Sequence, residues 1–536
     1  MHSRSASTGG DLADDQILEH LGPVCAESLC LLFVAHEQLH RVPCGEQGAD
    51  GMRADEAGAA GDEDAHRPPP PSIGGLREPA TPRRVKRRGA GRGRKVFRGS
   101  VAALAPWLSS TCLREQCGPP GGDMSISGSV AAAFWPVAQA FERQIDASGG
   151  GAAVCVYYEG RKVVDLWGGV RDEHGRPWQE DTMSMSFSTS KGITSTLLNQ
   201  LVDRGELDYD DPIARYWPEF GANGKGTISV RDLMTHRAGL SRIRTLIDRG
   251  DRILDWEYMT DRLAGAEARA TSHSAYHALT YGWLTGELIQ RVAGRPLGDV
   301  IREELEEPLG LDGIYIGAPP EAKARAAQLS SRPGSSRPGI MEWIFSDRTA
   351  TNLTRFNRLI GSRLDVKHLL DALVPPDGAE ALFDDDRILD VPVPAANGLF
   401  TARSLARLYA AIAEEGALDG VRLLSPSAIR RMSEVQVKTP DRVLPVRMYW
   451  RLGYHTAFTY KGGLRTGFGH FGFGGSGAWA DPSRRLSVAM INNRVGGTPF
   501  GDIRIAAIGS SVLNARKRIE LDGASGKALH PELVLV

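Results

Sequence analysis

Strand patterns occur near both ends of the globular part of this 536-residue chain, and helical patterns fill the region between them. Residues 152–158 and 162–167 predict two strands joined by the tight turn Glu159-Gly160. Residues 476–480 and 485–492 predict two more strands close to the C-terminus. We therefore expect an α/β (α+β) fold, in which one antiparallel sheet of N- and C-terminal segments is flanked by helices and carries an inserted, mostly helical region.

Several amphipathic helices are predicted around these strands, because apolar residues recur there at helical spacing. One of them, near residue 236, is expected to be short and to stop at Gly239. The predicted helices cover residues 133–145, 188–205, 230–236, 404–415 and 502–515.

The bulk composition is that of an ordinary soluble globular protein, with 41% hydrophobic and 24% charged residues. A net charge of −1 gives no overall field that would attract nucleic acid. No apolar run reaches the length of a membrane span, and the N-terminus lacks the residue order of a secretory signal. Of the 6 cysteines only Cys155 follows residue 124, and a lone thiol forms no internal disulfide. We therefore expect a cytoplasmic protein without an integral membrane segment.

Residues 1–123 differ from everything after them. They contain four consecutive prolines and a basic run over 83–98, and they show no sustained helical or strand period. We expect a disordered extension, since a nucleic-acid arm would have aromatic residues among the basic ones. A third possibility is that the segment is not native and that Met124 is the true start, because an amphipathic helix follows it at once. Mapping the N-terminal peptide of the native protein tests this hypothesis.

Ser188-x-x-Lys191 opens the helix predicted to end near Gly205. Residues three apart share a helix face, so the hydroxyl and the amine would point into the same cleft. A serine becomes a good nucleophile when an adjacent base takes its proton. Burial and the positive end of the helix dipole would make Lys191 such a base. The tetrapeptide alone, however, is more typical of an ordinary helix start, with Ser188 as N-cap and Lys191 in solvent.

Two further elements bear on the chemistry. Tyr276 lies just before a predicted helix and, taken alone, indicates a half-buried packing residue. Residues 469–476 read Gly-His-Phe-Gly-Phe-Gly-Gly-Ser, and these glycines would let a backbone lie close to a ligand. His470 within this segment is equally compatible with a packing or a surface role.

The order of these three elements resembles the layout of the serine β-lactamase and penicillin-binding superfamily. Residues 233–240, Leu-Met-Thr-His-Arg-Ala-Gly-Leu, resemble the Leu-x-Thr-His-x-x-Gly-Leu stretch of class C-like members. Residues 397–402, Asn-Gly-Leu-Phe-Thr-Ala, resemble their Gly-Leu-x-Ser/Thr-x-x-Asp segment. The chain is most similar to the β-lactamase-fold esterases, namely carboxylesterase family VIII and its mycobacterial-type relatives. The resemblance spans about residues 130–515 and covers none of residues 1–123.

The resemblance implies a β-lactamase/transpeptidase-like catalytic domain over residues 124–520. Its α/β part is expected at about 130–210 and 395–515, with the helical insertion at about 211–394. A tail follows over residues 521–536.

The resemblance also implies roles for the three motifs. Ser188 would be the acylating nucleophile and Lys191 its proton acceptor. Tyr276 would be a second base, a tyrosinate favoured by the nearby ammonium, and would activate water for deacylation. The backbone N–H groups of Ser188 and of about Phe473 would form the oxyanion hole.

Two motifs depart from the family pattern. The Tyr-x-Asn motif reads Tyr276-His277-Ala278, so the amide side chain is missing. The Lys-Thr-Gly motif reads His470-Phe471-Gly472, three residues that we expect at the substrate site. A mostly neutral imidazole and a phenyl ring cannot bind the carboxylate of a β-lactam as a lysine and a hydroxyl do. The aromatic residues expected to accommodate an apolar acyl chain instead are Phe471, Phe473, Trp283 and Trp479.

These motifs predict a serine carboxylesterase, or lipase-like hydrolase, that cleaves esters of small or medium acyl chains through an acyl-enzyme. Two alternatives stay open: a β-lactamase or D-amino-acid peptidase/amidase of the same fold, and a non-catalytic scaffold or binding homologue. An α/β-hydrolase is not supported, because residues 474–478 fall one glycine short of Gly-x-Ser-x-Gly.

His236 is expected to be a structural hydrogen-bonding residue. No cofactor or metal is implied, the expected partner is a small-molecule ester, and the oligomeric state is left open.

Overall fold

The computed structural model describes residues 126–331, 347–359, 365–376, 386–444, 446–495, 504–524 and 533–536. All of these residues belong to the same unit of the chain. The expectations for residues 1–123 and for a start at Met124 lie outside the described residues.

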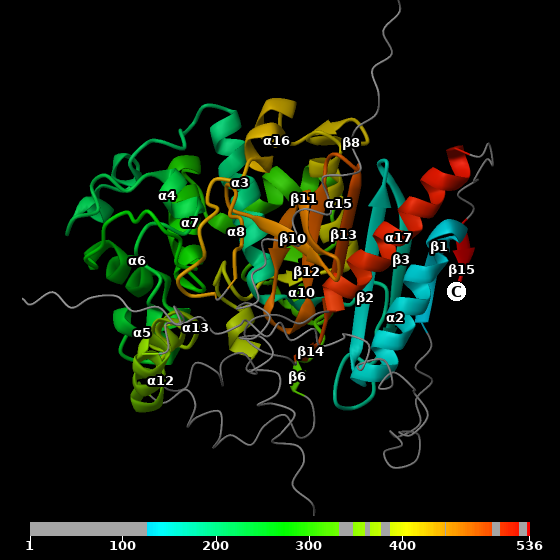
Figure 1. The fold of residues 1–536 in the computed structure, drawn as a ribbon, viewed down its shortest axis with the longest axis horizontal. Helices are drawn as coiled ribbons and strands as arrows, with labels where there is room; N and C mark the ends of the chain where they lie inside the picture. Colours follow the sequence, from blue (N-terminus) through cyan, green and yellow to red (C-terminus); the bar gives the residue numbers. More distant parts are fainter. Residues whose placement is uncertain are drawn as a thin grey trace, which may run out of the picture. The chain divides into compact units, whose positions relative to one another are not determined.

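An antiparallel sheet of eight strands forms the centre of the described structure (Figure 1). The strand order is β10-β11-β12-β13-β2-β3-β1-β15, and β13 joins the C-terminal strands to the N-terminal ones by pairing with β2. This confirms the expected sheet of N- and C-terminal segments. Its strands are β1 (Ile126–Ala131), β2 (Gly151–Tyr158), β3 (Arg161–Gly169), β10 (His455–Thr459), β11 (Gly462–Phe471), β12 (Gly477–Asp481), β13 (Leu486–Asn492) and β15 (Leu533–Leu535).

Alternation along β2 sends its side chains into two separate cores. Cys155 and Tyr157 belong to the larger apolar cluster, whereas Val154 and Val156 belong to a second cluster on the opposite face of the sheet. Successive residues of a strand point to opposite faces, so the apolar run in β2 marks a strand that is covered on both sides. The turn between β2 and β3 is the predicted one, with positive φ at both Glu159 and Gly160.

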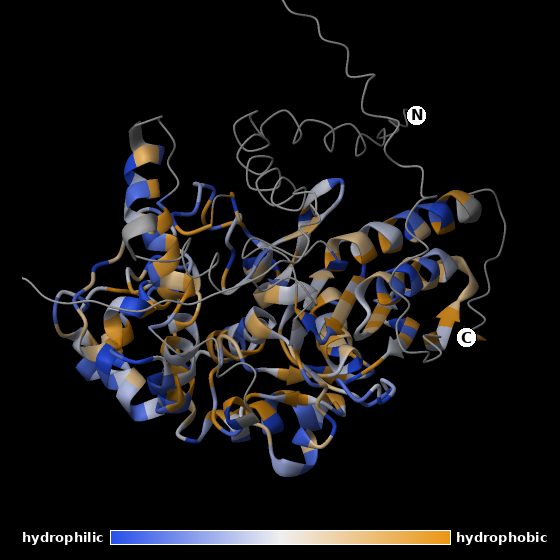
Figure 2. Ribbon diagram, turned by 90° about the horizontal axis from the view of Figure 1, so that it is seen from below, coloured by the Kyte–Doolittle hydropathy of each residue, from blue (hydrophilic) through white to orange (hydrophobic). Residues whose placement is uncertain are grey.

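Helices cover both faces of this sheet. On one face α2 (Trp135–Ser148) and α17 (Arg504–Ala524) pack side by side, as Figure 1 shows, over the second cluster. On the other face lie α15 (Ala402–Ala413) and α3 (Lys191–Asp203), whose apolar residues join the larger cluster. In Figure 2 polar and apolar residues alternate along the helices beside the C-terminus, as expected for amphipathic helices.

Most of the remaining elements lie between β3 and α15, as the predicted helical insertion requires. Three short strands, β4 (Ser184–Met185), β5 (Ile314–Tyr315) and β7 (Leu399–Phe400), form a small sheet of order β4-β7-β5. The helices are α4 (Val230–Met234), α5 (Ile243–Leu246), α6 (Trp256–Gly265), α7 (Thr280–Ala293), α8 (Leu297–Ile301), α9 (Glu307–Leu309), α10 (Pro320–Lys323), α12 (Asp347–Leu359), α13 (Val366–Leu373) and, after α15, α16 (Pro426–Ser433). Small pairs are β6 (Ser330–Ser331) with β14 (Arg494–Val495) and β8 (Ala417–Leu418) with β9 (Val421–Arg422).

Single-turn segments connect these elements. They are η4 (Ala132–Phe134), η5 (Phe187–Ser190), η6 (Ile213–Arg215), η7 (Pro218–Gly221), η8 (Gly250–Leu254), η9 (Arg302–Glu306), η10 (Asp386–Leu389) and η11 (Phe473–Gly475). In the part of the chain that the structure describes, no helix has both the length and the apolar character that crossing a bilayer requires.

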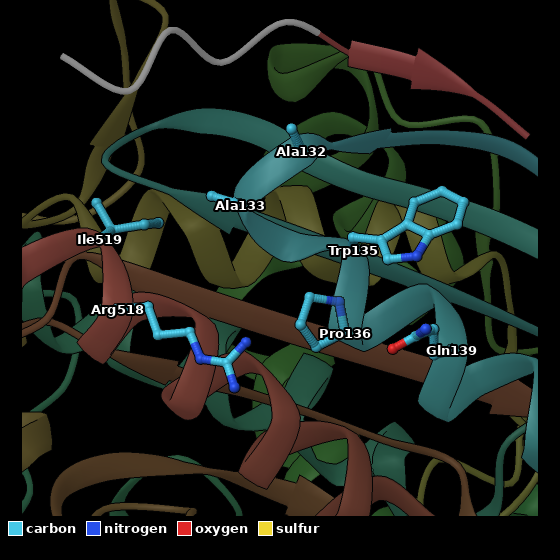
Figure 3. Close-up of a pocket in the computed structure, with 7 residues that line it drawn as sticks. All are labelled: Ala132, Ala133, Trp135, Pro136, Gln139, Arg518 and Ile519. Atoms are coloured by element: carbon cyan, nitrogen blue, oxygen red, sulfur yellow. The ribbon is translucent and has the colours of Figure 1, made fainter. Parts of the chain in front are cut away.

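The last helix is longer than predicted. α17 continues to Ala524, because Ile519 still packs against the cluster under α2 while Arg518 stays exposed. A surface hollow of about 350 Å³ lies beside this part of α17. Figure 3 shows its lining residues, of which Arg518 and Ile519 come from α17. Its other lining residues come from η4 and α2, and among them Trp135 is 42% exposed. The hollow therefore lies across the sheet from the helix that carries Lys191.

Candidate active site

Ser188 lies in η5, the turn that leads directly into α3. Phe187, the residue before it, has φ +46°, a left-handed conformation that a bulky residue adopts only where its surroundings hold it. The end of β11 lies directly against this turn, because a Cβ atom on Gly472 would come within 2.2 Å of the Ser186 carbonyl oxygen. The turn that carries Ser188 is thus held between α3 and the strand that carries the Gly-bracketed motif.

Lys191 is completely buried, and its amine nitrogen has three partners. Nζ lies 2.9 Å from Ser188 Oγ, 2.6 Å from the Ala278 carbonyl oxygen and 3.0 Å from that of Ala395. Burial lowers the pKa of Lys191 well below its ordinary value of 10.5, which favours the neutral amine. A neutral amine has two N–H donors and one lone pair. Since carbonyl oxygens only accept, the two carbonyls take both donors and direct the lone pair at Ser188 Oγ.

Tyr276 contacts the same serine from another side. Its hydroxyl lies 2.8 Å from Ser188 Oγ and donates to it, and its ring centroid lies 5.0 Å from Lys191 Nζ. Burial raises the pKa of Tyr276, and the negative charge of Asp441 raises it further. The raised pKa favours a protonated phenol rather than the expected tyrosinate, because burial also favours the neutral amine over the ammonium that was to stabilise the anion.

Four buried histidines lie near Tyr276, and burial lowers the pKa of each. His277 accepts the N–H of Leu240 at Nε2, and His455 accepts that of Phe471. His236 accepts the N–H of His277 at Nδ1, which agrees with the structural role expected for it. The described residues include no group of three or more His, Cys, Asp or Glu side chains arranged to hold a metal ion.

The residues that were expected to contact substrate lie in different environments in the structure. His470 is 1% exposed, and its Nε2 has no hydrogen-bond partner among the described residues. Phe473 is 41% exposed and packs edge-on against Phe187, with the ring centroids 5.5 Å apart. Phe471 differs from expectation: it packs against the cluster under α17, because alternation in β11 turns it away from the face that carries His470.

Two further aromatic residues were wrongly expected near the acyl chain. Trp283 is completely buried in α7, within the larger apolar core. Trp479 is completely buried in the second cluster, on the face of the sheet opposite α3. Both are packing residues, so neither offers surface to a substrate in this structure.

The Ala395 carbonyl belongs to a loop that a buried amide holds in shape. Asn397 Nδ2 donates to the carbonyl oxygens of Ile388 and Val391, both at 2.6 Å, and its Oδ1 accepts the N–H of Val393 at 3.0 Å. The next residue in the chain, Gly398, donates its N–H to Ser190 Oγ, which ties this loop to the turn that carries Ser188. Asn397 was visible in the sequence only as part of a family-like segment, and its role depends on contacts that no local pattern encodes.

Close packing of α7 against the same loop should depend on Gly282. A Cβ atom there would lie 2.5 Å from the Ala395 nitrogen and 2.9 Å from the Pro394 carbonyl carbon, so Gly282→Ala must displace the loop. A displacement of about 1 Å at a catalytic group costs roughly 10²-fold, and we expect a loss of that order in kcat/KM together with a lower melting temperature. Steady-state kinetics and thermal unfolding measure both.

The control for this change is Gly298→Ala in α8, where nothing lies within 4 Å of the added atom. It should keep wild-type activity and a melting temperature at least as high, since alanine is the better helix former. A Gly282→Ala protein as active as this control would contradict the assigned packing.

Comparisons with known proteins show the family of this chain. The family model described as Beta-lactamase matches residues 137–512. Esterase/beta-lactamase LipL of Mycobacterium tuberculosis is 39% identical over 385 residues, which span 70% of this chain and 85% of that protein. The chain belongs to the beta-lactamase family, as its motifs predicted.

Solved structures of the same fold include the crystal structure of a family VIII carboxylesterase, with 31% identity and a TM-score of 0.63. That match covers 74% of this chain and 99% of the other. A penicillin-binding protein homologue from Caulobacter crescentus has 33% identity and a TM-score of 0.60, over 72% of this chain and 99% of the other. The predicted β-lactamase/transpeptidase-like fold is therefore confirmed.

Proposed function

We propose that this protein is a serine esterase that cleaves carboxylic esters of small or medium acyl chains through an acyl-enzyme on Ser188. The observation that carries the proposal is a fully buried Lys191 whose nitrogen lies 2.9 Å from the hydroxyl of a half-buried serine. The ester class is supported by a relative named esterase/beta-lactamase and by the similar structure of a family VIII carboxylesterase.

Acylation begins when Ser188 Oγ attacks the ester carbonyl carbon and its proton passes to Lys191 Nζ. Two backbone N–H groups, those of Ser188 and Phe473, stabilise the oxyanion. The bond to the alcohol then breaks, and the leaving oxygen takes a proton from the Tyr276 hydroxyl. The Lys191 ammonium returns a proton to that phenol, so the amine is neutral again in the acyl-enzyme.

Deacylation uses the same groups in reverse. Water attacks the acyl carbon and gives a proton to Tyr276, whose own proton moves to Lys191. When the bond to Ser188 breaks, Oγ recovers its proton from the Lys191 ammonium. A protonated Tyr276 thus serves as a relay, which fits the raised pKa of its phenol and its 2.8 Å contact with Ser188 Oγ.

The surroundings of Ser188 suit a neutral, apolar acyl group. His470 stands where the family motif has a lysine, and burial lowers the pKa of its imidazole well below the usual range, so it supplies no fixed positive charge. The side chains beside the nucleophile include the aromatic pair Phe187 and Phe473, of which Phe473 is partly exposed to solvent.

A panel of p-nitrophenyl esters of graded chain length, compared with nitrocefin and a D-amino-acid amide, tests the proposal. We expect turnover of short and medium esters, with kcat/KM for nitrocefin lower by about 10²-fold or more, because a fixed donor to its carboxylate is missing. Efficient nitrocefin turnover without ester cleavage would instead favour a β-lactamase. Absence of activity on all three substrate classes would favour the non-catalytic homologue.

We also propose that the catalytic domain spans residues 124–520 and acts in the cytoplasm on small-molecule esters, without nucleic acid as a partner. A cytoplasmic location is supported by Cys155, which is buried as a free thiol. The absence of a nucleic-acid partner is supported by the net charge of −1.

A further inference from the structure

A buried carboxylate, Asp441, binds the backbone of Tyr276. The Asp441 residue is 8% exposed, and both of its carboxylate oxygens accept hydrogen bonds. Oδ1 accepts the backbone N–H groups of Tyr276 at 3.0 Å, Val443 at 2.8 Å and Leu444 at 3.0 Å, and Oδ2 accepts the indole N–H of Trp450 at 3.0 Å. All four of these donors are uncharged. The carboxylate therefore joins its own loop, an indole ring and the main chain of a proposed catalytic residue.

Trp450 in turn holds the ring of Tyr276. The two rings are stacked, with centroids 5.6 Å apart and an angle of 10° between their planes. His236 meets the Tyr276 ring edge-on at 5.0 Å and the Trp450 ring at 4.2 Å. Since Trp450 and His236 are completely or almost completely buried, the phenol cannot turn without displacing a packed ring.

The backbone around Tyr276 is not held by regular secondary structure and depends on contacts with other segments. Residues 274–277 belong to no helix or strand, and α7 begins only at Thr280. Besides the bond from the Tyr276 N–H to Asp441, a second hydrogen bond joins the two segments: the N–H of Arg442 donates to the Ser274 carbonyl oxygen at 2.9 Å. Asp441 and Arg442 thus fix the segment on both sides of Ala275.

We propose that Asp441, acting through Trp450 and the main chain of Tyr276, is a positioning residue that sets the distance between the Tyr276 hydroxyl and Ser188 Oγ. The inference rests on the proposed esterase function and adds to it a residue that touches no reacting atom. The charge of Asp441 acts in the same direction as its geometry, because it raises the pKa of the phenol and so favours the protonated relay.

Asp441→Asn tests this role. The amide keeps one accepting oxygen for the backbone N–H groups, but its NH₂ would face the indole N–H of Trp450, so two donors would oppose each other. A p-nitrophenolate leaving group needs no proton, so acylation by such esters depends on Lys191 alone, and the proton that Lys191 takes from Ser188 passes to the solvent. Deacylation needs the Tyr276 relay. We expect kcat to fall by about 10- to 100-fold with kcat/KM changed by less than about 3-fold, and a burst of p-nitrophenol to appear.

Further variants separate positioning from folding. Trp450→Phe keeps a ring on Tyr276 but removes the bond to Asp441, and it should show the same burst with a smaller loss of kcat. The double variant Asp441→Asn with Tyr276→Phe should be no slower than Tyr276→Phe alone, because both changes act on one relay. Asp146→Asn, an exposed acid on α2, is the matched control and should behave as wild type.

Active-site titration with a fluorophosphonate decides between the outcomes. A burst with a full titre of labelled serine supports positioning by Asp441. Equal losses of kcat, kcat/KM and titre in both Asp441→Asn and Trp450→Phe would assign Asp441 a merely structural role and overturn the proposal, as would unchanged kinetics. Failure of the esterase function itself is distinct, since the wild-type protein would then not turn over esters.

Discussion

Ser188→Ala is expected to lower kcat for ester hydrolysis by at least about 10⁴-fold, because every proposed covalent step passes through the Oγ atom that it removes. The change is small in volume and lies at a half-buried position. Lys191 keeps its two carbonyl partners, so the fold should be retained. Turnover of a p-nitrophenyl ester, covalent labelling by a fluorophosphonate and the melting temperature measure the three expectations.

A matched control is Ser483→Ala, an exposed serine on the turn between β12 and β13. It should retain full activity and full labelling. Labelling that persists in Ser188→Ala would show that the nucleophile is another residue, and it would remove the basis of the proposed mechanism.

Lys191→Met is expected to slow acylation by at least about 10³-fold, a loss in the upper part of the range for removal of a general base. Methionine fills the same buried space without a lone pair or a donor. The Ala278 and Ala395 carbonyls would lose this donor, at a cost of roughly 1–3 kcal/mol each, and the removal of an amine from an apolar site offsets part of it. The rate of the first turnover, measured by stopped flow, reports acylation directly.

Circular dichroism and thermal unfolding provide the control for this variant, which should remain folded. A folded Lys191→Met protein that acylates at the wild-type rate would mean that some other group takes the proton of Ser188. The assignment of Lys191 as the base would then be wrong, whatever the role of Ser188.

That Ser188, Lys191 and Tyr276 lie together could be predicted because the signals are local or ordered along the chain. Ser188 and Lys191 are three residues apart on one helical turn, and Tyr276 precedes a helix, in an order that resembles one superfamily. The supporting groups gave no such signal. The carbonyls of Ala278 and Ala395 are backbone atoms that any residue would supply, and Asp441 lies 165 residues from Tyr276 in the chain.

The errors have physical reasons of the same kind. Phe471 and Trp479 were expected near the substrate from their aromatic character, but the alternation of a strand decides which face a side chain occupies. Once His470 faces α3, its neighbour Phe471 must face α17. The tyrosinate was expected from a nearby ammonium, whereas complete burial of Lys191 favours the neutral amine. Burial of that kind depends on the packing of α3, α7 and the loop before β7, and no motif encodes it.

The central claim is that Lys191 is a neutral amine poised on Ser188. The most direct test is the rate constant for labelling of Ser188 by a neutral fluorophosphonate, measured from about pH 5 to about pH 11 in wild type and Lys191→Met. The neutral fraction of an amine increases as the pH rises through its pKa, so the wild-type rate should rise through one ionisation well below 10.5 and then level off. The variant should lack that rise. A wild-type rate that keeps rising into the range of an ordinary lysine, or an identical profile in both proteins, would contradict the claim.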